Sequence, residues 1–383
     1  MDRTDFLDHQ WPYLVSLLPP DLDLEESART CGALTRRRGI RDADSLLRLA
    51  LAYGFCGLSL RQTAAWAQVS GVGHVSDVAV LKRLRGSSSW LGEILGAMLT
   101  HRSKTALPTE LGMRFRLVDA TTVSVPGSTG TDWRVHMGFD LERLAIDEVE
   151  LTDYRRGETL RRFDVRAGEL LIGDRGYSHR AGMAAVCKAG GHFLIRLNWN
   201  TVPLQDRQGV RFDILETLRQ IADAEAVEFP VQTAPHPKAG LDSIPARLIA
   251  VRKSELAAEA GRRKVRQSQS RKQKSTDVRT LEAASYTFVL TSLPDSLLTA
   301  DQLMELYRFR WQIELAFKRL KSVLNLDEMP AKDPDLCRSF LYSKLLAALL
   351  LDDLSERFLS FSPWGYPLSG AQSKPLENPA RAS

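Results

Sequence analysis

Cysteine is scarce in this sequence. Four cysteines occur in 383 residues, and no two of them stand in the C-x-x-C spacing of a zinc ligand pair or a redox motif. The four positions are Cys31, Cys56, Cys187 and Cys337. Neither a disulfide framework nor a cysteine-based zinc site is therefore expected, and a reducing compartment fits this composition best.

Long apolar runs are absent as well. The longest, residues 345–351, is far short of the roughly 20 apolar residues that a membrane helix needs. The charged start of the chain, residues 1–5, has no apolar segment behind it, so we expect no signal peptide and a cytoplasmic protein. Hydrophobic residues make up 44% and charged residues 26%, which excludes collagen-like, coiled-coil and wholly disordered chains.

The excess of positive charge is small, with 52 basic against 47 acidic residues, a net charge of +5. The distribution of the charge along the chain is more informative than the net charge, because residues 252–279 hold ten Lys or Arg and only three acids. Two interpretations of this stretch stay open. It is either a solvated helix or basic loop, or a surface that binds nucleic acid.

The first hundred residues follow a helical pattern. Helices are predicted over residues 42–53, 59–67 and 76–84, and Gly71 and Gly73 separate the last two. A helix, a glycine-containing turn and a helix with a basic end are typical of a helix-turn-helix, although generic helical hairpins share this shape. We predict a helical, DNA-binding N-terminal domain over residues 1–105.

From residue 114 the pattern changes to that of strands. The predicted strands are 114–123, 133–139, 144–152, 169–173, 192–197 and 286–291, with a helix at 179–188. Residues 127–130 are interpreted as a hairpin turn, because the Gly-Lys-Ser/Thr ending of a phosphate loop is missing. Three strands followed by alternating helix and strand predict an α/β fold with a mixed sheet.

This α/β domain is expected in two parts. The first covers residues 110–198 and the second 285–360, with a β-rich insertion that includes the basic stretch at 199–284. The tail, 361–383, is rich in Pro, Gly and Ser and is expected to be disordered.

Two carboxylates occupy unusual places in the predicted sheet. Asp119 lies inside an apolar strand, where an acid is unfavourable unless something binds it. Asp174 ends a buried strand, at the sheet edge where open α/β folds place their sites.

A third carboxylate lies on a helix predicted over residues 303–324. At 100° per residue its core face is formed by Leu306, Phe309, Ile313, Phe317, Leu320 and Leu324. An adjacent arc carries Tyr307, Arg310, Glu314 and Lys321. Surface ion pairs would explain that arc on their own. If the helix instead packs over both strands, three carboxylates meet, and such oxygen ligands select Mg²⁺ or Mn²⁺, two of which can cleave a phosphodiester.

These residues carry a resemblance. The spacing Y-x2-R-x3-E-x6-K from Tyr307 to Lys321 resembles that of the DDE transposases of bacterial insertion sequences, insertion-sequence family four. Residues 119–123 (DATTV) and 173–177 (GDRGY) are similar to the first and second acidic blocks of that family. The three blocks stand in the family's order, with an insertion before the third, and a similar helical segment precedes them.

The resemblance implies a ribonuclease-H-like catalytic domain in which Asp119, Asp174 and Glu314 bind two Mg²⁺ or Mn²⁺ ions. It implies cut-and-paste DNA transposition through hairpinned transposon ends. The expected partners are double-stranded DNA, as terminal inverted repeats and as target, and a second copy of the chain in the synaptic complex. It also implies that the protein lies in a bacterial cytoplasm and associates with the nucleoid.

The same resemblance assigns DNA contacts. Arg310 and Lys321, which flank the third carboxylate, are expected on DNA phosphates together with Tyr307. Family members stack a flipped base on an aromatic side chain in the strand before the last helix. Tyr286 falls near that place, and a shift of one residue would put Thr287 there instead.

Two other functions stay open. Only 62 residues follow Lys321, where family members often carry a longer region for dimer contacts, so the chain is alternatively a worn copy that binds transposon ends without cutting them. The second alternative is a ribonuclease-H-like nuclease. Strand-transfer products would exclude it, because a simple nuclease only cuts.

Overall fold

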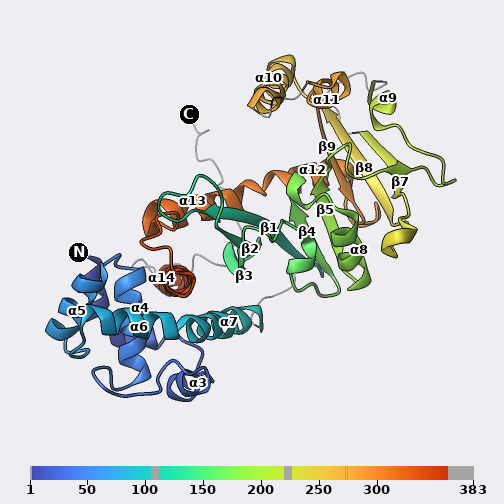
Figure 1. Cartoon of the computed structure of the whole chain (residues 1–383). Helices are drawn as coiled ribbons and strands as arrows, with labels where there is room; N and C mark the ends of the chain where they lie inside the picture. The colour runs from blue at the N-terminus through green and yellow to red at the C-terminus, as the bar shows by residue number, and fades with distance from the viewer. Residues whose placement is uncertain (1, 105–111, 220–226, 272, 274, 361–383) are drawn as a thin grey trace, which may run out of the picture. The chain divides into compact units, whose positions relative to one another are not determined.

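The computed structural model describes residues 2–104, 112–219, 227–271, 273 and 275–360. The chain divides into two units, a helical one made of residues 1–98 and 330–383 and a sheet-containing one made of residues 99–329 (Figure 1). None of the helices in the described ranges combines the length and the apolarity that crossing a membrane requires.

The helical unit is built mostly from short helices, several of which are capped by a side chain. They are α1 Arg3–His9, α2 Trp11–Val15, α3 Leu24–Thr30, α4 Ala43–Gly54, α5 Leu60–Val69, α6 Asp77–Gly86 and α7 Ser88–Lys104. Asp42, Ser59 and Ser76 each accept a hydrogen bond from the backbone of the first turn that follows, and Ser59 forms a full capping box. The helices predicted over 42–53, 59–67 and 76–84 are thus confirmed as α4, α5 and α6, with α5 packed on α6.

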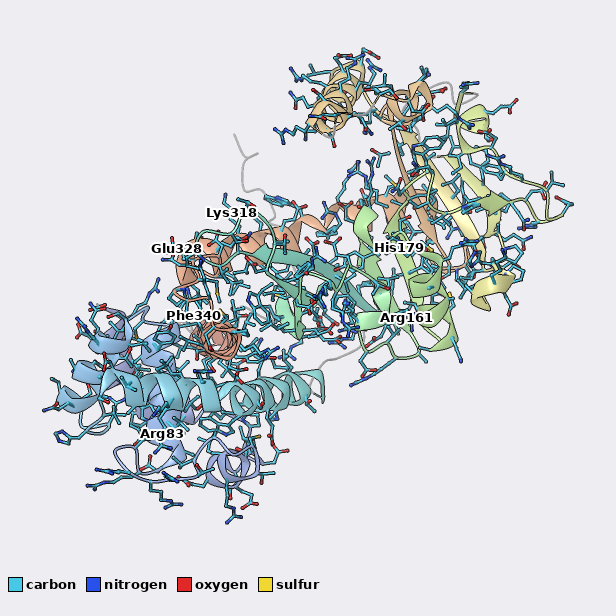
Figure 2. The ribbon with its side chains drawn as sticks, viewed as in Figure 1. Arg83, Arg161, His179, Lys318, Glu328 and Phe340 are labelled. Atoms are coloured by element: carbon cyan, nitrogen blue, oxygen red, sulfur yellow. The ribbon has the colours of Figure 1, made fainter. Side chains whose placement is uncertain are left out.

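The last helix of the chain belongs to this helical unit. Helix α14, Pro334–Ser360, packs on α4 and α6, so the stretch after Met329 leaves the α/β unit in which residues up to 360 were expected. A side chain at Gly54 would lie 2.4 Å from the Cβ of Ser343, which shows how closely α4 and α14 approach. Phe340 packs edge-on against Tyr53 with ring centroids 5.6 Å apart (Figure 2).

The second unit is organised around a mixed sheet. Its first five strands are β1 Arg114–Val123, β2 Trp133–Asp140, β3 Ala145–Asp153, β4 Glu169–Gly173 and β5 His192–Arg196. They lie in the order β3-β2-β1-β4-β5, with β1, β2 and β3 antiparallel and with β4 parallel to both β1 and β5. The predicted strands and hairpin are confirmed, and the fold is the expected ribonuclease-H-like one.

The insertion continues the same sheet. Its elements are β6 Leu204–Gln205, α9 Ile214–Arg219, β7 Val227–Thr233, β8 Pro245–Arg252, α10 Glu255–Arg271 and α11 Val278–Ala283, followed by β9 Tyr286–Thr291. Strand β9 pairs antiparallel with β5, and β8, β7 and β6 follow in that order, so that nine strands form one sheet. The basic stretch is largely α10, a mostly exposed helix.

Two further segments position the site. Helix α8, Arg180–Lys188, follows the 3-10 turn η2, Arg175–Tyr177, and its Met183 and Val186 join the core on one side of the sheet. The helix predicted over 303–324 is divided into α12, Ala300–Arg308, and α13, Trp311–Leu324. At the break the amides of Phe309 and Arg310 bond three residues back, a tighter turn than that of an α-helix.

Charged side chains are buried at the start of β1. Arg114 and Arg116 form ion pairs at 2.5–3.2 Å, and Arg116 is 3% exposed. Their partners on β2, β3 and β4 are Asp140, Asp147, Glu148 and Glu169. Gly138 makes room for this network, because a Cβ there would lie 2.5 Å from Asp147 Oδ1. The network ties four strands together at the end of β1 that lies away from Asp119.

Candidate active site

Neighbouring strands place Asp119 and Asp174 side by side. Strands β1 and β4 run parallel, and their last pair is Val118 with Gly173. The next residue on each strand is one of the two acids, so Asp119, inside β1, lies beside Asp174, which directly follows the carboxyl end of β4.

The Asp119 carboxyl is in an environment that disfavours its charge. Burial raises its pKa to about 6, and the negative charges of Glu158 and Asp174 act in the same direction. A hydrogen bond of 2.8 Å from the Ala120 amide and the positive charge of Arg310 oppose this rise. The net effect is a buried carboxyl whose charged form is disfavoured.

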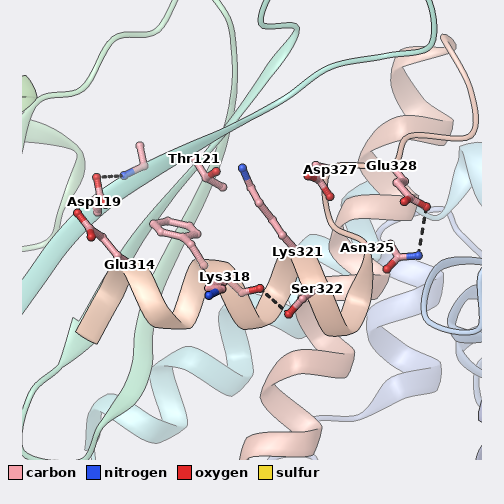
Figure 3. A pocket seen from close by; sticks show the side chains of 11 residues that line it. Asp119, Thr121, Glu314, Lys318, Lys321, Ser322, Asn325, Asp327 and Glu328 are labelled. Atoms are coloured by element: carbon pink, nitrogen blue, oxygen red, sulfur yellow. Dashed lines mark hydrogen bonds between the residues drawn. The ribbon is translucent and has the colours of Figure 1, made fainter. Parts of the chain in front are cut away.

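Glu314 reaches the same place from the first turn of α13, which packs on β1. In Figure 3 its carboxylate points toward Asp119, and both line a cavity of about 650 Å³. Its closest partner is Arg310, whose Nη2 lies 2.7 Å from Glu314 Oε1. The helix therefore brings the third acid to the cavity while an arginine of its preceding turn holds it.

The other residues of the Y-x2-R-x3-E-x6-K pattern surround these acids. Tyr307 donates a hydrogen bond of 3.2 Å to Asp174 Oδ1, and the Arg310 guanidinium lies 5.9 Å from the Tyr307 ring centre. Burial, and next the charge of Asp174, raise the pKa of the Tyr307 hydroxyl. Lys321 lines the cavity with its side chain pointing into it, and Lys318 lies on the same wall (Figure 3).

Tyr286 is not brought to this cavity. It is 2% exposed in the core of the sheet, with the Arg252 guanidinium 5.6 Å from its ring centre. Thr287, which points to the opposite face of β9, lines a second cavity of about 550 Å³ together with Tyr307 and Arg310. Burial therefore keeps the Tyr286 ring from the place where a base could stack.

Two exposed aromatic side chains near the site were not predicted from the sequence. Trp311 is 57% exposed and lines the second cavity, and Phe309 is 51% exposed. A continuous helix would have placed Phe309 on the core face. The break between α12 and α13 turns it outward, and neither a proline nor a glycine marks that break in the sequence.

Four basic side chains repel one another near the candidate site. Burial, and then the positive charges of Arg196, Arg175 and Lys264, lower the pKa of Lys253 to about 8. Arg196 Nη1 lies 3.8 Å from Asp174 Oδ1. These four residues come from η2, β5, the end of β8 and α10, so only the folded chain brings them together. Cations that repel one another at one place favour a polyanionic ligand.

The acids match a hard divalent cation by their chemistry. Asp119 and Asp174 offer oxygen ligands on adjacent strands, and burial, with the charges of Glu158 and Asp174, raises the pKa of Asp119. Among the described residues, no three Asp, Glu, His or Cys side chains lie close enough together to hold a metal ion. Glu314 is paired with Arg310 instead, so binding would require that pair to open.

Comparison with known proteins gives a consistent picture. Residues 110–350 match the family described as "Transposase DDE domain". The chain is 41% identical to the InsL protein of insertion sequence element IS186A from Escherichia coli (strain K12), over 92% of this chain and 96% of that protein. The transposase for insertion sequence element IS421 from Escherichia coli matches with the same identity and the same coverage.

One solved structure is also similar. It is the cryo-EM structure of the piggyBac transposase synaptic complex with hairpin DNA, with 9% identity and a TM-score of 0.42 over 94% of this chain and 77% of that one.

Proposed function

Because this chain belongs to the transposases with a DDE domain, we propose that it moves an insertion sequence by a cut-and-paste mechanism. It would cleave DNA at the terminal inverted repeats of its own element and join the freed ends to target DNA. The observation that supports this proposal is that the pairing of β1 with β4 brings Asp119 next to Asp174, while Asp119 and Glu314 line one cavity.

The carboxylates are the proposed ligands of Mg²⁺ or Mn²⁺. Two such ions would lower the pKa of bound water and stabilise the leaving oxygen of the phosphodiester. Asp119 and Asp174 would hold them from the sheet, with Tyr307 keeping the Asp174 carboxylate in place by its hydrogen bond. Glu314 would complete the set once Arg310 is drawn to a DNA phosphate.

Strand cleavage and transfer then follow from one site. Water attacks the phosphorus at the transposon end, and the 3′-oxygen leaves as a free 3′-hydroxyl. That hydroxyl attacks the opposite strand and forms a hairpin, which water reopens before the same hydroxyl joins target DNA. The two attacks by water each break one phosphodiester bond, and the two attacks by the 3′-hydroxyl each break one phosphodiester bond as they form another, so no covalent bond to the protein is needed.

Basic surfaces of both units are proposed to hold the DNA. Arg310 and Lys321 would bind phosphates next to the cleaved bond, and the cluster of Arg175, Arg196 and Lys253 offers charge on the other side of Asp174. Exposed basic residues of α10 extend this surface, and α5 and α6 are the proposed reader of the end sequence. A synaptic homodimer in a bacterial cytoplasm completes the proposal.

One observation favours a second candidate, a protein that binds transposon ends without cutting them. The Arg310–Glu314 pair occupies the third of the proposed cation ligands. If DNA does not open that pair, the phosphate contacts remain while the third ligand is withheld.

The test is metal-dependent cleavage of labelled DNA that carries the ends of the element. The wild type is compared with Asp174→Ala and with Asp242→Ala, which removes an exposed acid of the insertion. Nicks or hairpins at the element boundary with Mg²⁺ or Mn²⁺, lost only in Asp174→Ala, support the transposase. Specific binding without cleavage by the wild type supports the second candidate, and cuts without joined products support a nuclease.

A further inference from the structure

A fourth carboxylate lies close to the active site. Glu158 belongs to the loop between β3 and the 3-10 turn η1, Leu160–Arg162, and is half-buried. Its carboxylate rests on Gly176, two residues after Asp174, so closely that a Cβ on that glycine would lie 1.6 Å from Glu158 Oε2. The seat exists only because residue 176 has no side chain.

Glu158 acts on the same groups as the catalytic acids. Its negative charge helps to raise the pKa of Asp119, as the charge of Asp174 does. No ion pair or hydrogen bond of the Glu158 carboxylate is found within the described part of the chain. A half-buried carboxylate beside two others, without a cation of its own, is unfavourable unless a cation binds there.

A second side chain points to the same place. The Tyr177 hydroxyl is fully buried and has no hydrogen-bond partner among the described residues. Burial, followed by the negative charges of Asp119 and Glu158, raises its pKa, and the positive charges of Arg134 and Arg162 oppose this rise. The hydroxyl is thus a donor without an acceptor at the edge of an acidic cluster.

Nearby arginines do not explain these groups as a structural ion network. Arg162 bonds to both oxygens of Glu150 and to the Gly157 carbonyl, and Arg134 bonds to the Arg156 carbonyl. Buried polar side chains normally have partners, and an orphaned donor beside unpaired acids requires an explanation. A divalent cation that binds Asp119 and carries its own water molecules would provide one, because carboxylates outside the ligand set commonly orient such groups.

We propose that Glu158 is a positioning residue of the active site, a fourth carboxylate that strengthens the binding of a divalent cation at Asp119 from its seat on Gly176. This proposal rests on the proposed function, since it assumes the cation site at Asp119 and Asp174. It adds an acid that lies outside the three-carboxylate set.

The seat on Gly176 gives two independent ways to remove the carboxylate. Glu158→Gln keeps the size of the side chain and removes its charge. Gly176→Ala keeps the charge but places a methyl group where Oε2 lies, so the flexible carboxylate must move away. The matched control is Gly157→Ala, since a Cβ at Gly157 meets nothing within 4 Å. Neither glycine has a positive φ, so alanine suits both backbones.

The measurement is Mn²⁺ binding to the full chain without DNA, by isothermal titration calorimetry at neutral pH. Glu158→Gln and Gly176→Ala should each weaken Mn²⁺ binding by about three- to tenfold, as expected for one charge several ångströms from a divalent cation. The double variant should bind no more weakly than either single one, because both remove the same group. Gly157→Ala should bind like the wild type.

The outcomes separate this inference from the proposed function. Asp174→Asn should lose most of the affinity, and wild-type binding by that variant would overturn the proposed cation site and this inference with it. Wild-type binding by Glu158→Gln, alongside weak binding by Asp174→Asn, would overturn the role of Glu158 alone. Thermal unfolding of each variant checks folding, and if Glu158→Gln fails to fold, Gly176→Ala against Gly157→Ala decides the question.

Discussion

His136 provides a direct test of the sheet that carries the active site. Its imidazole on β2 is fully buried, with Nε2 3.0 Å from Thr152 Oγ1 and Nδ1 without a partner among the described residues. Burial, and then the positive charges of Arg162 and Arg134, lower its pKa from 6.5 to about 3. The folded protein therefore keeps this imidazole neutral at pH values where an unfolded chain protonates it.

The sign of the pH dependence follows because the pKa of His136 is lower in the folded chain than in the unfolded chain. As the pH falls below about 6.5, His136 of the unfolded chain binds a proton that the folded chain does not bind. The free energy of unfolding therefore decreases until the pH reaches the pKa of His136 in the folded chain. Each pH unit in this window contributes about 1.4 kcal/mol, which gives about 2 kcal/mol at pH 5. Above about pH 7 the contribution of His136 to the pH dependence vanishes.

The assay compares the wild type with His136→Gln, whose amide does not titrate and can keep the hydrogen bond to Thr152. Urea unfolding of both proteins is measured at about pH 7.5 and about pH 5. Between these values the wild type should lose about 2 kcal/mol more than the variant, since other titrating groups are common to both. In the same range the imidazole proton resonances of His136 should not shift. Equal losses in both proteins, or a resonance that titrates near pH 6.5, would refute the buried, neutral state.

Three more predictions follow from the contacts of single side chains. Glu314→Gln should keep binding to transposon ends and lose metal-dependent cleavage, and cleavage near the wild-type rate would remove Glu314 from the ligand set. Arg310→Ala should weaken binding to any DNA and lower the slope of log K against log salt by about one, if one phosphate contact is lost. The exposed Arg161 supplies its control, Arg161→Ala, and an unchanged slope would place Arg310 in a structural ion pair only. Arg116→Met should cost about 3–5 kcal/mol in urea unfolding, because it takes one of two arginines from the buried acids and leaves Glu148 without its ion-pair partner, and a loss below about 1 kcal/mol would contradict that burial.

The elements that carry the candidate acids could be predicted because their patterns are local. Strand β1 is rich in β-branched residues and β4 is a short apolar run, so the place of Asp119 inside one strand and of Asp174 at the end of the other followed from the sequence. The pairing of β1 with β4 then required only the usual parallel arrangement of neighbouring strands.

Features that depend on contacts between distant segments could not be predicted in the same way. The break between α12 and α13 has no sequence signal, and it moves Phe309 from the core to the surface. Burial of Tyr286 depends on which face of β9 meets the core, and a slip of one residue exchanges it with Thr287. The contact of Glu158 with Gly176 brings together two segments that are distant in the sequence, and no periodic pattern in the sequence indicates that they approach each other.

Helix α14 has a consequence for how the chain is made. It is the last described segment to leave the ribosome, yet it packs on α4 and α6 near the start of the chain. The sheet-containing unit, residues 99–329, is synthesised before that helix, whereas the helical unit lacks α14 until the end of the described chain has left the ribosome. A premature stop after residue 329 would therefore remove α14 from the helical unit and leave the described strands in place. If the helical unit reads the ends of the element, as proposed, such a stop would abolish recognition of the element before it abolished chemistry.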